Sequence, residues 1–80
     1  MEIITSILRL CKNEGATKTR IVYHANLNFK VAGVYLDWLT NHQLLAKENT
    51  HYKTTEAGVS LLATSQEIVS LINEELKHKN

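Results

Sequence analysis

Apolar positions recur every three or four residues over most of the chain, which predicts a mainly helical protein. The first such stretch predicts a helix from about residue 2 to residue 13, followed by Gly15 where helices commonly end. Cys11 lies on the apolar side of this helix and is the only cysteine, so we expect a small core residue in a reducing compartment. No cluster of positive charge surrounds Cys11, and we expect no reactive role for it.

Short polar segments separate the next elements. Thr17 is a favourable N-cap for a second helix over about residues 18–24. Asn26 suits a left-handed turn, and Asn28 suits the N-cap of a third helix that ends near residue 42. The spacing then changes, because two short β-prone ends flank a polar centre within residues 44–54, and this pattern predicts a hairpin.

The last helix is predicted to begin after Thr54 or Thr55 and to run to about residue 77, because no glycine or proline interrupts it after Gly58. The order of three helices, a two-stranded hairpin and a long helix predicts a mainly α (α+β) fold of the winged helix-turn-helix type. Residues 1–58 would form this domain, and residues 59–80 would continue from it as a C-terminal helix.

The third helix has two different faces on a wheel of about 100° per residue. Its core-facing side is expected to hold Phe29, Ala32, Leu36 and Leu39, extended by Val31, Tyr35 and Trp38. Its outward side holds Lys30, Gly33, Val34, Asp37 and Asn41. In a helix-turn-helix protein this helix would enter the major groove of DNA, and residues near its N-terminus would reach base edges.

Charge is unevenly distributed along the 80 residues. Residues 1–53 carry seven Lys and Arg against four acids, whereas the remainder carries two against four. Such asymmetry favours a basic face that meets an anionic partner. Phosphate contacts are expected at the start of the second helix, where free backbone N–H groups already favour anions, and on the hairpin; the residues are Lys18, Thr19, Arg20, Lys47 and Lys53.

Base contacts are expected from Asn28, Lys30, Gly33 and Val34 on the third helix. Gly33 would permit close approach of the backbone to DNA, and Val34 would touch a thymine methyl group. Asp37 would either accept a hydrogen bond from a cytosine amino group or repel phosphate.

Two motifs carry a resemblance to a known family. The first consists of Gly15, Ala16, Lys18, Thr19, Ile21, Val22 and Tyr23, followed by Asn26, Leu27, Asn28 and Phe29; the second consists of Tyr52, Thr55, Glu56 and Gly58. Together they resemble the small archaeal winged-helix transcriptional regulators. Some of these relatives are dimeric, chromatin-associated DNA-binding proteins whose last helices pair as an antiparallel coiled coil. The resemblance implies a cytoplasmic, nucleoid-associated protein that binds double-stranded DNA as a dimer.

The sequence departs from this resemblance at two places. Relatives often carry basic residues where Gly33 and Val34 stand, so strong charge-driven DNA affinity is not expected from the third helix. They also often carry glycine before the hairpin, which is called the wing in this fold, where this chain has Gln43.

The last helix has a heptad-like seam with spacings of 3, 4, 3 and 4, formed by Leu62, Ser65, Val69, Ile72 and Leu76. A helix of about 22 residues extends roughly 33 Å, which is longer than so small a domain needs. We therefore expect a C2 homodimer through this seam, while Val59, Leu61 and Leu62 are expected to pack on the domain itself. The alternative is a helix that folds back along its own domain.

Other chemistry is not indicated. Each of the four histidines lies singly, away from any metal-ligand spacing, and no nucleophile set or glycine-rich phosphate loop is present. We therefore expect no enzyme, cofactor, metal or small-molecule ligand, and no membrane segment. The leading function is a DNA-binding transcription regulator or nucleoid-associated protein. The alternative is a winged-helix adaptor that binds a protein of the transcription machinery, with Val34 beside Gly33 as its docking surface.

Overall fold

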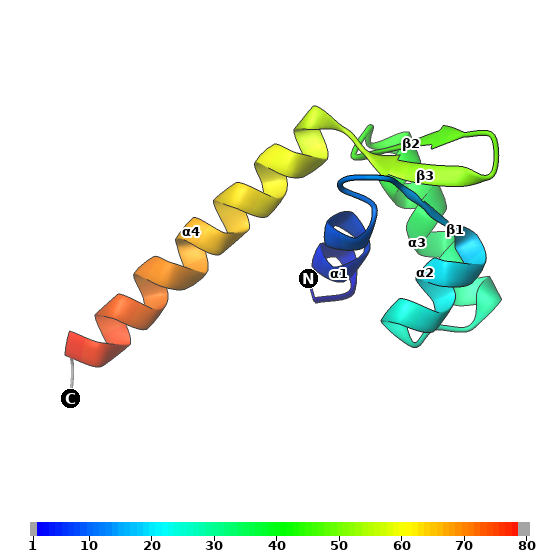
Figure 1. The fold of residues 1–80 in the computed structure, drawn as a ribbon. Coiled ribbons are helices and arrows are strands. Elements are labelled where there is room, and N and C mark those ends of the chain that lie inside the picture. Colours follow the sequence, from blue (N-terminus) through cyan, green and yellow to red (C-terminus); the bar gives the residue numbers. More distant parts are fainter. Residues whose placement is uncertain (1, 79–80) are drawn as a thin grey trace.

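The computed structural model describes the backbone of residues 2–78 and the side chains of residues 3–68 and 71–73. In chain order the elements are α1 (Glu2–Leu10), β1 (Ala16–Thr17), α2 (Lys18–Ala25), α3 (Phe29–Asn41), β2 (Leu45–Glu48), β3 (His51–Thr54) and α4 (Glu56–His78) (Figure 1). This order confirms the predicted winged helix-turn-helix. The caps are confirmed as well, because the side chains of Thr17 and Asn28 accept hydrogen bonds at the starts of α2 and α3.

The sheet has three antiparallel strands in the order β1-β3-β2, where a two-stranded hairpin was predicted. The additional strand, β1, pairs with the central strand through Ala16 opposite Tyr52 and Thr17 opposite His51. Two residues are too few to produce a periodic pattern in a sequence, which explains why β1 was not predicted. Because β1 leads directly into α2, it fixes the start of α2 against the wing.

The prediction that Gly15 ends the first helix is wrong. The first helix ends at Leu10, earlier than expected, so Gly15 does not end it. Gly15 has a φ of 83°, and a Cβ atom there would lie 3.0 Å from the carbonyl oxygen of Tyr52. A glycine is therefore required where the chain enters β1, both for its left-handed conformation and for its close approach to β3.

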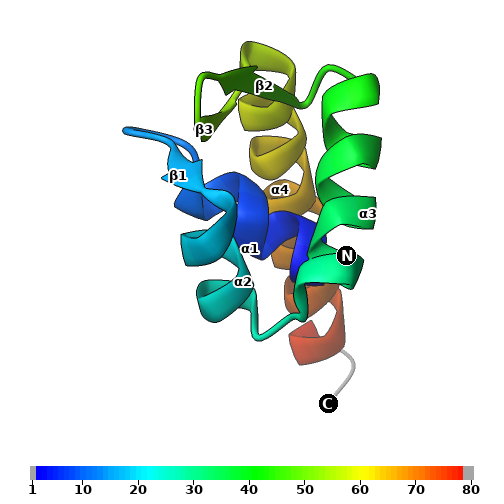
Figure 2. The same cartoon turned by 90° about the vertical axis from the view of Figure 1, so that its right-hand side faces the viewer.

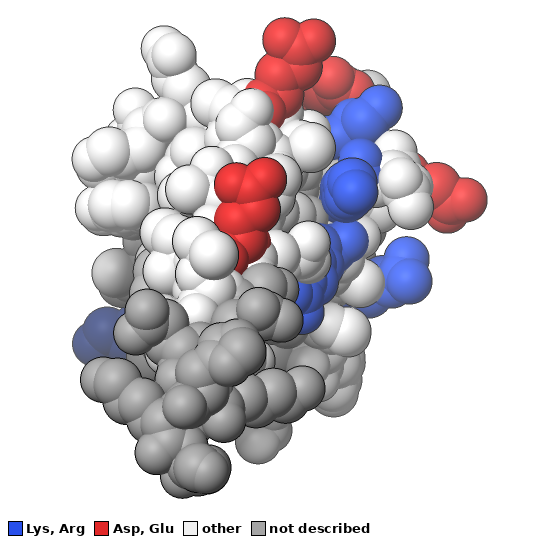
Figure 3. All heavy atoms as spheres, turned by 90° about the vertical axis from the view of Figure 1, so that its left-hand side faces the viewer, with Lys and Arg blue, Asp and Glu red and all other residues white. Residues whose placement is uncertain are grey.

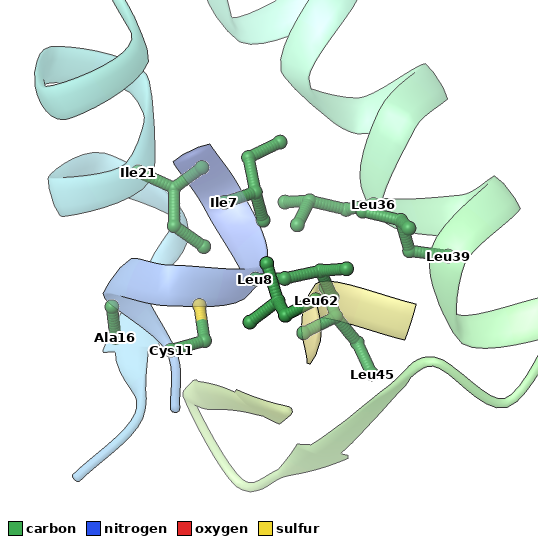
Figure 4. Close-up of a cluster of buried hydrophobic side chains, with 9 residues drawn as sticks. All are labelled: Ile7, Leu8, Cys11, Ala16, Ile21, Leu36, Leu39, Leu45 and Leu62. Carbon is green, nitrogen blue, oxygen red and sulfur yellow. The ribbon is translucent and has the colours of Figure 1, made fainter. Parts of the chain in front are cut away.

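The core forms where all the helices meet the sheet (Figure 4). Its buried members are Ile7, Leu8, Cys11, Ala16, Ile21, Leu36, Leu39, Leu45 and Leu62. In Figure 4 the side chains from the other elements converge on Leu8 of α1. Cys11 is fully buried, as predicted, and burial raises the pKa of its thiol to about 11. This thiol is therefore a packing group rather than a nucleophile.

The buried face of α3 is narrower than predicted. Ala32, Leu36 and Leu39 are buried, but Phe29 is 52% exposed, and Val31 and Trp38 are also exposed. The reason is that α3 packs mainly on α2 and β2, two short elements that cover only a strip of its surface. Several apolar side chains of α3 are therefore left on the outside of the molecule.

The last helix begins on the domain and then leaves it. The hydroxyl of Thr55 caps α4 by accepting a hydrogen bond of 3.1 Å from the Gly58 N–H. The early turns of α4 pack on α1 and β3, but its remaining part extends away from the body (Figures 1 and 2). The radius of gyration is 14.2 Å, whereas a compact chain of this length would have roughly 12 Å. Thus α4 does not fold back along its own domain.

Candidate nucleic-acid interface

The start of α2 is built to present cationic side chains. Thr17 ends β1 and accepts a hydrogen bond of 3.3 Å from the backbone N–H of Arg20, so its side chain caps the helix. Thr19 and Arg20 are exposed beside this cap. The other N–H groups of the first turn have no partner within the helix, and together with the helix dipole they favour an anion. This end of α2 is suited to a phosphate group.

The Lys18 side chain lies against α3. Its Nζ atom is 5.9 Å from the centroid of the Phe29 ring, within the range of a cation–π interaction. A Cβ atom built on Gly33 would lie 3.2 Å from the same Nζ atom. The ammonium group of Lys18 is thus located at the junction of α2 and α3, over the first turns of α3.

The outer face of α3 carries the predicted polar residues, but one of them is already engaged. Asn28 caps α3, and its Oδ1 atom accepts a hydrogen bond of 2.8 Å from the Val31 N–H. Its side-chain amide nitrogen is not used by this cap. Lys30, Val34 and Asp37 are exposed, and their side chains are accessible to a ligand on this face.

The two hairpin lysines lie on opposite faces of the wing. Lys47 is opposite Tyr52 in the β2–β3 register, and its Nζ atom lies 5.6 Å from the centroid of the Tyr52 ring. Lys53 is opposite Ala46, one position along, so its side chain points to the other face of the sheet. The sequence alone gave no reason to distinguish Lys47 from Lys53. A ligand that contacts one face of the wing would meet only one of these two lysines.

Basic side chains gather along one side of the face in Figure 3, while acidic side chains lie at its top, at its right margin and near its centre. Exposed Lys and Arg side chains come from α1, the loop after it, α2, α3 and both hairpin strands, and they are Arg9, Lys12, Arg20, Lys30, Lys47 and Lys53. The basic side chains therefore come from several elements rather than from α3 alone.

An apolar strip lies on the outside of α3, where only Val34 was predicted, because Val31 and Trp38 were expected on the core-facing side. Val34 is 65% exposed, and Val31 and Trp38 lie three or four residues from it on the same side. The Trp38 ring stacks on His42 with centroids 4.0 Å apart, and His42 donates a hydrogen bond from Nδ1 to the Trp38 carbonyl oxygen at 2.9 Å. The i, i+4 spacing of Trp38 and His42 was the available sequence signal.

The predicted seam of α4 is divided by the structure. Leu62 is only 5% exposed and belongs to the core of its own domain, so it is not available as an interface residue. Ser65 is half-buried and Ile72 is exposed. The side chains of Val69 and Leu76 lie outside the described residues.

Exposed apolar side chains nevertheless continue along α4. Ile68, Leu71 and Ile72 are each more than half exposed, and their spacing of three and four residues places them on one side of the helix. Ile68 and Leu71 were not predicted at this surface because neither belongs to the strict heptad seam.

Among the described residues, no group of three or more His, Cys, Asp or Glu side chains is arranged to hold a metal ion. No helix in the described part of the chain combines the length and the apolar character needed to cross a membrane.

A helix-turn-helix followed by a β-hairpin, with a cationic helix start beside an exposed third helix, defines a winged-helix protein. The chain belongs to the winged helix-turn-helix family, whose family model matches residues 1–73.

Two uncharacterized proteins of Methanocaldococcus jannaschii are similar in sequence. One is 31% identical over 74 residues, which cover 92% of this chain and 76% of that protein. The other is 36% identical over 70 residues, which cover 88% of this chain but only 33% of that protein. This chain therefore corresponds to about one third of the second, longer relative.

Two solved structures have a similar fold. Sso10a-2, described as a DNA-binding protein from Sulfolobus solfataricus, aligns with a TM-score of 0.71 and 32% identity, over 98% of this chain and 85% of that chain. A protein of unknown function from Listeria innocua aligns with a TM-score of 0.76 and 18% identity, over 91% of this chain and 55% of that chain. The second likeness concerns the fold alone.

Proposed function

We propose that this protein binds double-stranded DNA as a homodimer and acts as a transcription regulator or nucleoid-associated protein. The observation that carries the proposal is the capped, cationic start of α2 beside the exposed face of α3, within a winged helix-turn-helix fold. The similarity to Sso10a-2, which is described as DNA-binding, supports it.

In this proposal each part of the fold has one task. The start of α2 binds the phosphate backbone through Lys18, Thr19 and Arg20, and α3 enters the major groove with its exposed residues toward the bases. One of the two wing lysines, Lys53 or Lys47, adds a contact with the DNA backbone. The other lies on the opposite face of the wing. Because phosphate contacts supply most of the attraction, an α3 surface with few charges is compatible with DNA binding.

The second subunit would bind along α4. Ile68, Leu71 and Ile72 are exposed apolar side chains in the second half of α4, and this half of the helix projects from the domain (Figure 1). Two such helices packed side by side would bury these side chains, and would also place two α3 helices on one DNA duplex. Two modest contacts linked in this way give a much higher combined affinity than one.

The experiment is a fluorescence-anisotropy titration of a DNA duplex at two salt concentrations. The wild-type protein is expected to bind, with an affinity that falls as salt rises. Arg20→Ala should flatten the log–log salt slope by about 0.9 for each phosphate that Arg20 neutralises in the wild-type complex. Arg9→Ala is the matched control, because Arg9 is an exposed arginine of α1, outside the helix-turn-helix, and its removal should leave the slope unchanged.

A second function is favoured by one observation. The exposed strip of Val31, Val34 and Trp38 has the apolar character of a protein-docking surface. A winged-helix adaptor without strong DNA binding would use this strip to bind another protein. Absence of duplex binding at low salt would favour the adaptor over the DNA-binding protein.

A further inference from the structure

Gly33 occupies a position in α3 that its backbone does not explain. It lies within the helix and does not have the positive φ that favours glycine at Gly15. Glycine is the least favourable residue in a helix interior apart from proline. A glycine at this position leaves open, beside α3, the space that a side chain would fill.

That space is occupied by the end of the Lys18 side chain. A Cβ atom on Gly33 would lie 3.2 Å from Nζ of Lys18 and 4.0 Å from its Cε. Phe29 lies one helical turn before Gly33 on the same side of α3, and its ring is 5.9 Å from the same Nζ atom. Lys18 is half-buried, although lysine side chains are usually exposed. The ammonium group thus lies between an aromatic ring and a glycine of the neighbouring helix.

We propose that Phe29 and Gly33 are positioning residues, which hold the Lys18 ammonium group at the α2–α3 junction for contact with a DNA phosphate. This inference rests on the proposed DNA-binding function and deepens it. A free lysine loses much rotamer freedom when it binds a ligand, and a lysine already held on α3 loses less. A cation beside the start of α3 lies where the DNA backbone borders the major groove in a helix-turn-helix complex.

The sequence suggested another role for Gly33, namely space for the DNA itself. The two roles differ in what happens when Lys18 is absent. If Gly33 makes room for Lys18, a larger residue at position 33 weakens binding only while Lys18 is present. If Gly33 makes room for DNA, the larger residue weakens binding in either case.

A double-mutant cycle on duplex affinity separates these roles. The proteins are wild type, Gly33→Leu, Lys18→Ala and the double variant. We expect Gly33→Leu and Lys18→Ala each to weaken binding by roughly two- to fivefold per subunit, the range of an exposed ion pair. The double variant should bind no more weakly than Lys18→Ala alone. As a matched control, Gly33→Leu should keep its full effect in a Lys53→Ala background, because Lys53 lies on the wing.

A second measurement detects the arrangement without DNA. The Phe29 ring should shift the Hε protons of Lys18 upfield in the NMR spectrum of the free protein, and Phe29→Leu should abolish that shift. If Phe29 only packed against other residues of the domain, its ring would not shift the Lys18 signals. Hε protons at their free-lysine position in the wild-type protein would overturn the inference.

The outcomes of the cycle are distinct. If the wild-type protein binds no duplex at low salt, the proposed function fails and this inference fails with it. If the wild-type protein binds and Gly33→Leu weakens binding equally with and without Lys18, only the inference is overturned, and Gly33 makes room for DNA.

Discussion

The hydroxyl of Thr54 donates a buried hydrogen bond of 2.6 Å to the backbone carbonyl of Leu8, which joins the end of β3 to α1. A second bond of 3.0 Å, from the Thr54 N–H to the carbonyl of Cys11, strengthens the same junction. These contacts anchor the wing to the helix at the centre of the core. They also explain how Thr54, a polar residue, is accommodated in the core.

We therefore expect Thr54→Val to lower the free energy of unfolding by about 1–3 kcal/mol, because the Leu8 carbonyl would be buried without its partner. Thr54→Ser is the control, since it keeps the hydroxyl and loses one methyl group, worth about 0.8 kcal/mol. Urea unfolding of the three proteins measures the difference. A Thr54→Val protein as stable as wild type would contradict the assigned role of this hydrogen bond.

Gln43 should be a position where glycine improves stability. It has a φ of 60° and follows the end of α3, where the Leu44 N–H bonds to the Leu39 carbonyl and the Gln43 N–H bonds to the Thr40 carbonyl. This is the Schellman arrangement, in which glycine is the usual left-handed residue.

We expect Gln43→Gly to raise the free energy of unfolding by up to about 1 kcal/mol, as relief of the left-handed conformation is partly offset by the greater entropy of glycine in the unfolded chain. Asn41→Gly, within α3, should instead lower it by about 0.5–1 kcal/mol. Thermal or urea unfolding measures both variants, and equal effects of the two substitutions would show that the conformation of Gln43 has no cost.

Cys11 should make stability depend on pH in alkaline solution. Burial raises the pKa of its thiol from 9.0 to about 11, so between these values the unfolded chain releases a proton that the folded chain retains. Ionisation of Cys11 therefore leaves the free energy of unfolding unchanged below about pH 9. As the pH rises toward 11 it lowers the free energy of unfolding, by roughly 1.4 kcal/mol at pH 10.

Urea unfolding at pH 8 and pH 10 measures this loss, with Cys11→Ala as the control because the other titrating groups are common to both proteins. The wild-type protein should lose more stability over this interval than Cys11→Ala. Equal losses would mean that the Cys11 thiol does not have a raised pKa in the folded state.

The α4 surface gives a test of the dimer. We expect Ile72→Asp to dissociate the homodimer, because a carboxylate without a partner would be buried between the two helices. Ala63→Asp is the matched control, since Ala63 is exposed and lies on the other side of α4. Size-exclusion chromatography with light scattering measures the mass of each protein. A wild-type protein that is monomeric at micromolar concentration would contradict the proposed dimer.

Much of the fold could be predicted because local signals agreed with the final structure. Thr17 and Asn28 are good caps, and Asn26 and Asn49 adopt the left-handed conformation that asparagine tolerates. The motif residue Gly58 has a packing reason, because a Cβ atom there would lie 2.5 Å from the Leu44 carbonyl oxygen. The caps and the left-handed turns depend on a residue and its near neighbours, which a sequence displays directly, whereas the contact at Gly58 joins α4 to the segment before β2.

The site was harder to predict because it depends on contacts between elements. Helical spacing placed Phe29 in the core, but in the structure its ring lies outside and faces Lys18. Lys47 and Lys53 appeared equivalent until the strand register assigned them to opposite faces. A helical wheel gives directions around one helix and does not show how much of that helix its neighbours cover.

The most direct test of the proposed DNA binding is an NMR titration of the ¹⁵N-labelled protein with a DNA duplex at low salt. Non-specific affinities of about 10⁻⁴–10⁻⁶ M are sufficient to produce shifts at NMR concentrations. We predict that the largest amide shift changes occur in residues 17–20 and 28–37, at the starts of α2 and α3. No change on addition of duplex, or changes confined to α1 and the projecting part of α4, would contradict the proposed DNA binding.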